Sequence, residues 1–374
     1  MFSAADYDYM ARAVRLGRQG LYTTMPNPRV GCVLVKDGRI IADGWHEKAG
    51  EGHAEVRALA VAQESVEGAT AYVTLEPCSH TGKTGPCADA LIAAGVARVV
   101  YGMKDPNPQV AGRGLARIAQ AGIQVDGPLL EEQCRSLNPG FIKRMETGRP
   151  LLRCKLAMSV DGRTAMASGE SQWITSSAAR SDVQKLRARS CAVVTGVGSI
   201  IQDDSSLTVR ADELGLENAE TIAQRQPLRV VLDSNQHLPE TAKVVQSPAA
   251  DTLVVSLREN PDSALSEWVE QIALPADETG RIDPSAVLHE LGRRQCNEVL
   301  LETGAILAGA FLQAGLIDEL VVYMAPKLMG SQGRPLFDLP LDEMAQQYPL
   351  DIQDVRSVGN DWRLTIIPQR PSRQ

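Results

Sequence analysis

The sequence lacks the long apolar runs, the cysteine framework and the basic excess that mark several classes of protein. No stretch approaches the ~20 apolar residues that a helix needs to cross a bilayer. The first residues have neither the basic region nor the apolar core of a signal peptide. Seven cysteines, an odd number without disulfide-like spacing, fit a reducing compartment. These absences predict a cytoplasmic protein rather than a membrane or disulfide-stapled one.

Positive charge is scarce as well. The formal net charge is −8 at pH 7. Residues 1–150 hold 17 Lys and Arg against 16 Asp and Glu, and the remainder holds 21 against 30. Proteins that bind polynucleotides usually have a basic surface, because phosphate contacts supply most of their affinity. The sequence therefore favours a small-molecule substrate over nucleic acid, and no membrane partner is expected.

Length and composition are those of an ordinary multidomain chain. Apolar residues make up 44% and charged residues 22% of the 374 residues, as in a typical globular protein. At roughly 150 residues per domain, this length predicts two or three domains. The run Thr147-Gly148-Arg149-Pro150 looks like a linker. We therefore expect a first domain at 1–148 and a second at 149–374.

The first domain shows alternating helix and strand patterns. Apolar spacing predicts a helix over 3–20, and strand-like runs at 30–36 and 39–44 flank Asp37-Gly38, a strong hairpin signal. Further expected elements are helices near 52–63, 86–95, 114–121 and 131–145, and strands at 69–75, 96–102 and 123–125. Such alternation predicts an α/β fold in which helices cover a sheet.

The second domain is again α/β but does not repeat the first. Predicted strands cover 151–160, 191–195, 228–232, 252–256, 298–301 and 319–324, and predicted helices cover 177–189, 284–294 and 306–314. Residues 211–227 and 257–281 are polar and contain proline, so we expect surface loops there.

One group of residues has the composition of a zinc site. His53 and Glu55 lie two residues apart, and Cys78 and Cys87 each follow a proline further along the chain. One histidine and two cysteines can hold zinc and leave a fourth position for water. A carboxylate that is not a ligand can then move protons to and from that water, as in zinc nucleobase deaminases. We expect His53 at the start of a helix and Cys87 at a helix N-terminus, where the dipole lowers the thiol pKa.

Two features of this group argue against the metal site. Each residue alone is more simply a buried cysteine or a solvated His–Glu pair. The cysteines are also separated by eight residues, against two in the generic deaminase signature. The occurrence of all of them in order, with both prolines, favours the metal site.

Longer motifs around these residues resemble one family. They are Pro26-Asn27-Pro28-Arg29-Val30-Gly31, Gly52-His53-Ala54-Glu55-Val56, Leu75-Glu76-Pro77-Cys78-Ser79-His80-Thr81-Gly82 and Asp105-Pro106-Asn107-Pro108. Together they resemble the RibD family of bifunctional riboflavin biosynthesis enzymes, in which a pyrimidine deaminase is fused to a reductase. In that family the longer gap between the cysteines is normal. The resemblance covers about residues 5–368 and implies a cytidine-deaminase-like α/β/α zinc domain at the N-terminus.

The resemblance also implies roles for individual residues. One zinc ion per chain would be held by His53, Cys78 and Cys87, with Glu55 as the catalytic proton carrier. Activated water would attack the amino-bearing carbon of a diaminopyrimidinone ribosylamino phosphate. Residues expected near this substrate are Asn27, His46, His80, Lys83 and Asn107, with His80 and Lys83 beside its phosphate. Each of these five could instead be an ordinary surface polar residue.

Motifs in the second domain are less specific. Thr195-Gly196-Val197-Gly198-Ser199 follows a strand but lacks the third glycine of a dinucleotide fingerprint. Residues 302–309 form a strand end entering a helix whose free amides could receive phosphate. By themselves, both junctions are equally well explained as structural turns.

The resemblance to the RibD family extends through this domain, at residues 155–163, 171–175, 203–204, 207–210 and 325–327. It implies a dihydrofolate-reductase-like α/β domain that uses NADPH to reduce the ribosyl group to a ribityl chain. Cofactor contacts would come from Ala157, Trp173, Ser199, Asp203, Ser234, Gly304, Ala305, Ile306, Leu307, Ala308, Gly309 and Ala310. Substrate contacts would come from Ser171, Arg187, Leu207, Arg210 and Glu302, the arginines offering bidentate geometry to phosphate.

Two positions depart from the family pattern. Ser199 stands where threonine is usual, and Ser205 where proline often follows the paired aspartates. The first change preserves a hydroxyl, whereas the second could loosen a loop. The sequence does not indicate a proton donor for the reduction.

Two other interpretations compete with this one. The chain could be a nucleic-acid-editing deaminase with an unrelated C-terminal domain. Alternatively, the zinc could be structural in a binding module, with Cys32 or Cys134 as a fourth ligand. The family resemblance further predicts a homodimer or higher homo-oligomer.

Overall fold

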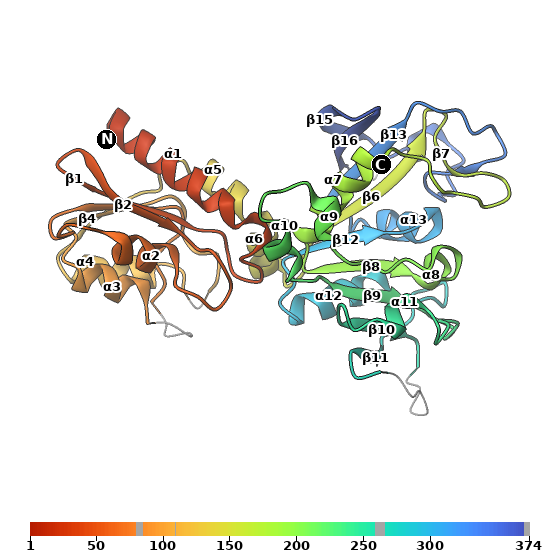
Figure 1. The fold of residues 1–374 in the computed structure, drawn as a ribbon, viewed down its shortest axis with the longest axis horizontal. Coiled ribbons are helices and arrows are strands. Elements are labelled where there is room, and N and C mark those ends of the chain that lie inside the picture. Colours follow the sequence, from red (N-terminus) through yellow and green to blue (C-terminus); the bar gives the residue numbers. More distant parts are fainter. Residues whose placement is uncertain (80–84, 109, 259–265, 370–374) are drawn as a thin grey trace. The chain divides into compact units, whose positions relative to one another are not determined.

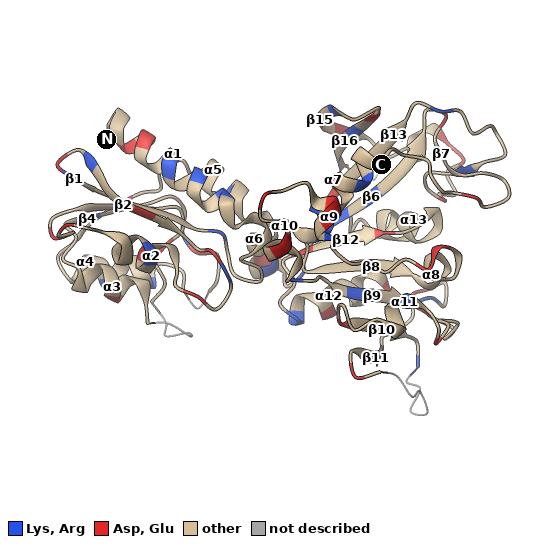
Figure 2. Cartoon of the chain, in the orientation of Figure 1, with Lys and Arg blue, Asp and Glu red and all other residues tan. Residues whose placement is uncertain are grey.

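The computed structural model describes residues 1–79, 85–108, 110–258 and 266–369. It divides into two compact units, Met1–Gly148 and Arg149–Gln374 (Figure 1). In both units Lys and Arg are interspersed with Asp and Glu (Figure 2). Among the described residues, no helix has both the length and the apolarity of a membrane span.

The first unit is a five-stranded sheet between two layers of helices. Its strands lie in the order β2 (Arg39–Trp45), β1 (Gly31–Lys36), β3 (Thr70–Val73), β4 (Arg98–Tyr101) and β5 (Gln124–Asp126). β1 is antiparallel to β2 and β3, and the remaining pairs are parallel. The predicted hairpin is confirmed, because Asp37 and Gly38 both have positive φ, as its tight turn requires.

Helices cover both faces of this sheet. One layer contains α1 (Ala4–Arg18) and α5 (Glu131–Leu137), and the other contains α2 (Ala54–Val61), α3 (Cys87–Ala93) and α4 (Arg113–Gln120). A capping box between Ser3 and Asp6 begins α1. A Cβ on Gly31 would lie 2.0 Å from the carbonyl oxygen of Ala13, so only glycine lets α1 approach β1 this closely.

The predicted single helix over 131–145 is wrong. The structure has two helices there, α5 and α6 (Pro139–Thr147), which meet at Asn138. Pro139 lacks the N–H that a continuous helix would need, and its ring restricts the preceding residue. The Asn138 side chain is bound to both main-chain groups of Arg29, at 2.7 and 2.8 Å. This contact fixes the helix junction to the start of the sheet.

The second unit contains a nine-stranded sheet. Its order is β11 (Val269–Ala273), β10 (Thr252–Ser256), β9 (Leu228–Leu232), β8 (Ala192–Gly196), β12 (Glu298–Glu302), β6 (Leu151–Ser159), β13 (Glu319–Ala325), β16 (Asp361–Pro368) and β15 (Leu350–Val358). The seven strands from β11 to β13 are parallel, and β16 and β15 join them antiparallel.

Alternating residues of this sheet pack on two helical layers. Leu152, Cys154 and Leu156 of β6 belong to a core that includes α12 (Pro284–Arg293) and α13 (Ala305–Gln313). Val193, Leu300 and Val321 face a second core that includes α7 (Ser177–Ala188). The remaining elements are α8 (Val197–Asp203), α9 (Ala211–Leu214), α10 (Ala219–Ala223), α11 (Lys243–Gln246), β7 (Arg163–Ala165), β14 (Arg334–Pro335) and the 3-10 helices η1 (Gln19–Tyr22) and η2 (Met344–Gln346).

Several segments of the second unit differ from expectation. Residues 211–227 contain α9 and α10, and residues 257–281 contain β11, where we expected loops. The antiparallel hairpin β15–β16 was not predicted. Most of β15 is exposed and its pairing carries a bulge, so it has no regular buried-face pattern to recognise.

Candidate zinc centre and reductase site

Three potential metal ligands meet in the first unit, each at the end of an element. His53 is the N-cap residue of α2, Cys78 follows the segment after β3, and Cys87 is the first residue of α3. Their ligand atoms all lie within 4.8 Å of one another. His53 Nδ1 is 3.2 Å from Cys87 Sγ and 3.6 Å from Cys78 Sγ. Tetrahedral zinc holds nitrogen and sulfur ligands about 3.5 Å apart, so these donors fit the ion.

The electrostatics of the three residues favour a bound cation. Hydrogen bonds from the Cys87 thiol, the His53 ring and the Cys87 main-chain N–H lower the pKa of Cys78 to about 4. The same thiol–thiol contact raises the pKa of Cys87, because the Cys87 thiol keeps the proton that it donates to Cys78. Zinc would replace that proton and leave both sulfurs as thiolates. Among the described residues, Cys32 and Cys134 do not join this ligand group, which leaves three ligands rather than a structural four.

Glu55 lies two residues after the histidine. It is on the first turn of α2 and only 3% exposed. Burial raises the pKa of Glu55 to about 7, and its carboxyl group contacts the Cys87 thiol through a hydrogen bond. A carboxyl group with a pKa near neutrality can both accept and return a proton. The position and the pKa suit a proton carrier beside the metal.

Two of the predicted substrate residues adjoin this cluster. The His46 ring lies edge-on to the His53 ring, with centroids 5.2 Å apart. Its Nδ1 contacts the Gly52 carbonyl oxygen at 3.1 Å and its Nε2 contacts the Asn27 amide at 3.1 Å. Burial lowers the pKa of His46. A neutral His46 thus holds the Asn27 amide beside the metal ligands.

Of the three remaining predicted substrate residues of this unit, Asn107 alone lies among the described residues. Asn107 lies on the loop between β4 and α4, where its carbonyl oxygen accepts hydrogen bonds from the N–H groups of Val110 and Ala111. His80 and Lys83 lie outside the described residues.

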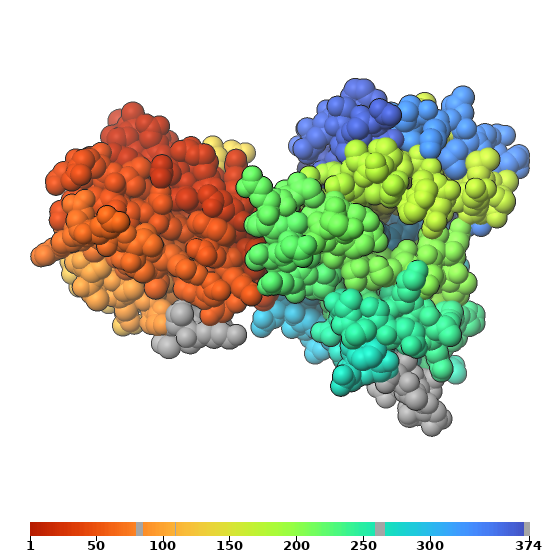
Figure 3. All heavy atoms as spheres, viewed as in Figure 1, coloured from red at the N-terminus to blue at the C-terminus, as the bar shows by residue number. Residues whose placement is uncertain are grey.

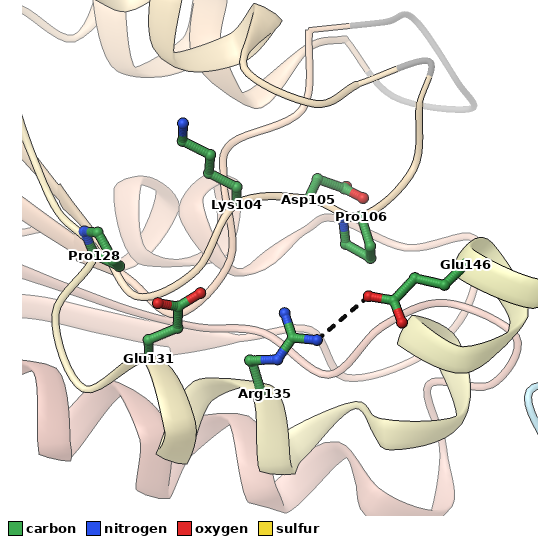
Figure 4. Close-up of a pocket in the computed structure, with 7 residues that line it drawn as sticks. All are labelled: Lys104, Asp105, Pro106, Pro128, Glu131, Arg135 and Glu146. Atoms are coloured by element: carbon green, nitrogen blue, oxygen red, sulfur yellow. Dashed lines mark hydrogen bonds and ion pairs between the residues drawn. The ribbon is translucent and has the colours of Figure 1, made fainter.

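A cavity of about 380 Å³ borders the same loop at residues 104–106 (Figure 4). Its lining residues are Lys104, Asp105, Pro106, Pro128, Glu131, Arg135 and Glu146. Arg135 and Glu146 form an ion pair across it at 3.3 Å. None of the three zinc-ligand candidates lines this cavity, so the metal site and the cavity are separate.

In the second unit, the predicted substrate residues gather around one buried ion pair. Arg187 on α7 binds Glu302, at the end of β12, through two hydrogen bonds of 2.6 and 2.9 Å. Burial would raise the pKa of Glu302, but the charge and hydrogen bonds of Arg187, together with the charges of Lys155 and Arg210, outweigh burial and lower the pKa. A third Arg187 nitrogen donates to the carbonyl oxygen of Thr208, next to buried Leu207. Arg210 follows on the same segment, with its guanidinium on the exposed carboxylate of Glu213.

Lys155 also belongs to this site, although the sequence analysis gave it no role. It pairs in register with Glu302 across β6 and β12. Burial lowers the pKa of Lys155, while the charges of Glu302 and Asp203 oppose that shift. A lysine directly between the buried Cys154 and Leu156 of β6 was a signal that could have identified it.

The predicted cofactor residues follow the carboxyl ends of neighbouring parallel strands. Ser199 lies on α8 after β8, Ser234 follows β9, and residues 304–310 follow β12 and begin α13. Ligands of open α/β sheets bind at this edge. Trp173 is 64% exposed, and the Arg180 guanidinium stacks 4.4 Å from its ring centroid. Figure 3 shows the surface of this unit hollowed between its yellow-green segment and the green to teal segment that follows.

The start of α13 has features that suit a phosphorylated cofactor. No side chain caps the N-terminus of α13, and a Cβ on Gly304 would meet nothing within 4 Å, so the main-chain amides at the start of the helix face open space.

The paired aspartates Asp203 and Asp204 differ in role. Asp203 receives a hydrogen bond from Gln172 at 3.4 Å, whereas Asp204 accepts one from the main chain of Lys243 at 2.9 Å and so fixes α11.

Comparison with known proteins identifies both units. The pattern described as "Cytidine and deoxycytidylate deaminase zinc-binding region" matches residues 3–103, and "RibD C-terminal domain" matches residues 150–364. Riboflavin biosynthesis protein RibD of Escherichia coli is 51% identical over 368 residues, covering 97% of this chain and 99% of that protein. The Haemophilus influenzae protein of the same name is 48% identical, covering 98% and 99%.

A solved structure agrees over the whole chain. Acinetobacter baumannii RibD is 47% identical and superposes with a TM-score of 0.89, covering 98% of this chain and 99% of that one. These matches exclude the interpretations of an editing deaminase with an unrelated second domain and of a binding module. They establish an α/β deaminase domain followed by an α/β reductase domain, and an enzyme that uses zinc and NADPH. The chain belongs to the RibD family of bifunctional riboflavin biosynthesis enzymes, which join a deaminase to a reductase.

Proposed function

We propose that the chain deaminates 2,5-diamino-6-(5-phosphoribosylamino)pyrimidin-4(3H)-one and then reduces the product to 5-amino-6-(5-phosphoribitylamino)uracil. A structural relative from Thermotoga maritima, 32% identical with a TM-score of 0.84, is named as a diaminohydroxyphosphoribosylaminopyrimidine deaminase and 5-amino-6-(5-phosphoribosylamino)uracil reductase. Residues 1–148 would perform the first reaction and residues 149–374 the second. The observation that carries the proposal is the group His53, Cys78 and Cys87 with buried Glu55 beside it.

The deaminase residues divide the work of replacing an amino group by oxygen. His53, Cys78 and Cys87 would hold zinc, which when bound activates water for attack on the amino-bearing carbon. Glu55 takes a proton from that water and delivers it to the departing nitrogen, which leaves as ammonia. The pKa of about 7 lets Glu55 do both without a large energetic penalty. Asn27, held by His46, would orient the pyrimidine ring.

The reductase residues mainly bind and align. NADPH, when bound, supplies a hydride to C1′ of the ring-opened ribosylamine, and one proton completes the reduction. The uncapped start of α13, with residues 304–310, would receive cofactor phosphate, and Trp173 would flank the cofactor. Ala157, Ser199, Asp203 and Ser234 complete the proposed cofactor set, and Ser171 and Leu207 the substrate set.

The two arginines of this site would act differently. The Nε and one Nη of Arg187, which form a bidentate edge of the guanidinium, are already bound to Glu302. Among the described residues, the Arg210 guanidinium contacts Glu213 near the surface, and substrate phosphate can displace that contact. We therefore assign the substrate phosphate to Arg210, and to Arg187 the positioning of Glu302 against the ribose hydroxyls.

We further propose that the protein is a homodimer and is located in the cytoplasm. Four large apolar side chains on one face of the β15–β16 hairpin are at least 47% exposed, namely Leu350, Ile352, Val355 and Trp362. Such a patch on an edge hairpin suits a second copy of the chain. None of the seven cysteines, all of which lie among the described residues, forms a disulfide, which suits a reducing compartment. Light scattering of the wild-type protein and of Trp362→Glu would test the dimer, and a monomeric wild type would refute it.

Mass spectrometry of the proposed substrate tests both reactions. The substrate is incubated with zinc-loaded protein alone, with protein and NADPH, and with chelator-treated protein and NADPH. We expect a gain of about one mass unit without NADPH and about two more with it. The chelator should abolish the first change. A mass change only in the presence of NADPH, or no change in any tube, would contradict the proposed order or the proposed substrate.

A further inference from the structure

A buried carboxylate next to the proposed metal site holds a distant loop of the first unit. Glu76 is 3% exposed and lies two residues before Cys78. Its Oε2 accepts hydrogen bonds from the main-chain N–H groups of Asp105 and Gly112, at 3.2 and 2.9 Å. Its Oε1 accepts one from Gly114 at 3.1 Å and a longer one from Leu115 at 3.5 Å. One carboxylate thus satisfies four main-chain donors that are close to Glu76 only in space.

Three of these donors belong to the N-terminus of α4. Gly112 is the N-cap residue and has no side chain to cap the helix itself. A negative charge at a helix N-terminus binds the unpaired N–H groups and the positive end of the helix dipole. The packing is close, because a Cβ on Gly114 would lie 1.9 Å from the carbonyl oxygen of Pro77. The start of α4 is therefore fixed against the residue that precedes Cys78.

The other donor lies at the opposite end of a loop. Asp105 follows β4, and Gly112 precedes α4, so Glu76 holds both ends of the segment between them. Asn107 lies within this segment, and its N–H group donates to the Asp105 side chain at 2.8 Å. Both ends of the segment are hydrogen-bonded to the carboxylate of Glu76, and Glu76 directly precedes Pro77 and Cys78 in the chain.

We propose that Glu76 is a positioning residue of the deaminase: its carboxylate sets the place of Asn107 relative to the metal ligand Cys78. This inference rests on the proposed function, because it takes Asn107 to contact the pyrimidine substrate. Glu76 does not touch the reacting atoms. It links the substrate-binding loop to the metal-binding segment through main-chain hydrogen bonds, so the loop keeps its distance from the metal when the substrate is absent.

Replacement by glutamine isolates the role of the charge. Glu76→Gln keeps the size and one oxygen, but its amide nitrogen is a donor facing two main-chain donors. Two of the four N–H groups lose their acceptor, and the helix dipole loses its counter-charge. The loop should move while the metal ligands stay in place. Exposed Glu132→Gln on α5 is the matched control, because it removes the same charge from the same unit away from the loop.

Steady-state kinetics of the full chain test the role. For Glu76→Gln we expect the deaminase KM to rise about tenfold or more with a smaller fall in kcat. Zinc content should remain one per chain, and the reductase rate of the same preparation should be unchanged. Glu76→Asp, which keeps the charge, should recover part of the loss. Loss of zinc, a fall confined to kcat, or a variant equal to Glu132→Gln would overturn the proposal.

A double substitution shows whether Glu76 acts through the loop. In Asn107→Ala protein the substrate contact is already gone, so adding Glu76→Gln should change kcat/KM by less than about threefold. Full additivity, or an Asn107→Ala variant with wild-type kinetics, would overturn the proposal. These outcomes differ from failure of the proposed function, which would appear as a wild-type protein that does not deaminate the substrate.

Discussion

The two sites differ in how far the chain completes them before any ligand binds. In the deaminase site, His53, Cys78 and Cys87 touch one another and Glu55 is 3% exposed. In the reductase site, one ion pair is buried, but Trp173 is 64% and Ile306 57% exposed. A reaction that needs a metal and a proton carrier requires a closed, organised centre. Hydride transfer needs mainly a surface on which cofactor and substrate align.

The difference predicts how the sites fail. A single substitution in the deaminase centre should remove the chemistry, because each group has one irreplaceable role. Contacts in the reductase site are spread over several strand ends, so a single substitution there should weaken binding without ending turnover. The units lie on separate stretches of the chain, and each activity can serve as the control for the other.

The largest effect is expected at Glu55. Glu55→Gln keeps the shape of the side chain but cannot take up a proton from water, so deamination should fall about 10³–10⁴-fold. Zinc content should stay at one per chain, and the reductase rate should not change. Enzyme kinetics and metal analysis on one preparation check both. Exposed Glu51→Gln, four residues before Glu55, is the control. Turnover retained in Glu55→Gln would remove Glu55 from the mechanism.

A smaller effect is expected from Arg187→Lys in the reductase site. Lysine keeps the charge but loses the two-bond contact with Glu302 and the bond to Thr208. We expect reductase kcat/KM to fall about 10- to 100-fold, equal to roughly 1.4–2.8 kcal/mol, with deamination unchanged. Arg189→Lys, two residues along the chain, is the control because Arg189 donates to a different carboxylate, that of Glu298. An equal loss in both variants would indicate general damage to α7.

The sequence predicted the deaminase centre better than the reductase site, for a physical reason. Metal ligation needs particular side-chain types at helix starts. For His53 and Cys87, both the side-chain type and the position at a helix start can be recognised from the sequence. The reductase site depends on which strand ends become neighbours. Lys155 meets Glu302 only because β12 is inserted beside β6, a pairing between residues almost 150 positions apart. Neither propensity nor spacing encodes that contact.

The same reasoning applies to the fold. Strands with buried faces, such as β9 and β10, were predicted with their observed limits. The exposed edge hairpin β15–β16 was missed because it lacks a clear inward face. Glu76 was recognised only as part of a motif. Its function depends on α4, whose first turn is close to it only after folding.

Stability of the first unit should depend on Asp6 in a pH-dependent way. Burial alone would raise the pKa of Asp6, but hydrogen bonds from Tyr72, Ser3 and Arg98 lower it well below 3.8. The stabilisation is therefore present above pH 3.8 and is lost as the pH falls below it. We expect Asp6→Asn to destabilise the unit by about 2 kcal/mol at pH 7 and by less at pH 3.

Calorimetry of zinc-free protein at both pH values measures this difference. At pH 7, the transition that shifts upward when zinc is added identifies the first unit. Exposed Asp8→Asn on the same helix is the control and should leave both transitions unchanged. An Asp6→Asn effect equal at pH 7 and pH 3 would show that the carboxylate charge is not what stabilises α1 against the sheet.

The smallest effect is expected from Ser199→Thr on α8. The change restores the residue usual in the family and keeps the hydroxyl on a half-buried, short helix after β8. The added methyl group costs a few tenths of a kcal/mol in helix propensity, and no described hydrogen bond is lost. The KM for NADPH should therefore change by less than about threefold, whereas Ser199→Ala should raise it further if the hydroxyl binds the cofactor. Equal KM values for all three proteins would remove Ser199 from the cofactor site and leave α8 contributing through its main chain alone.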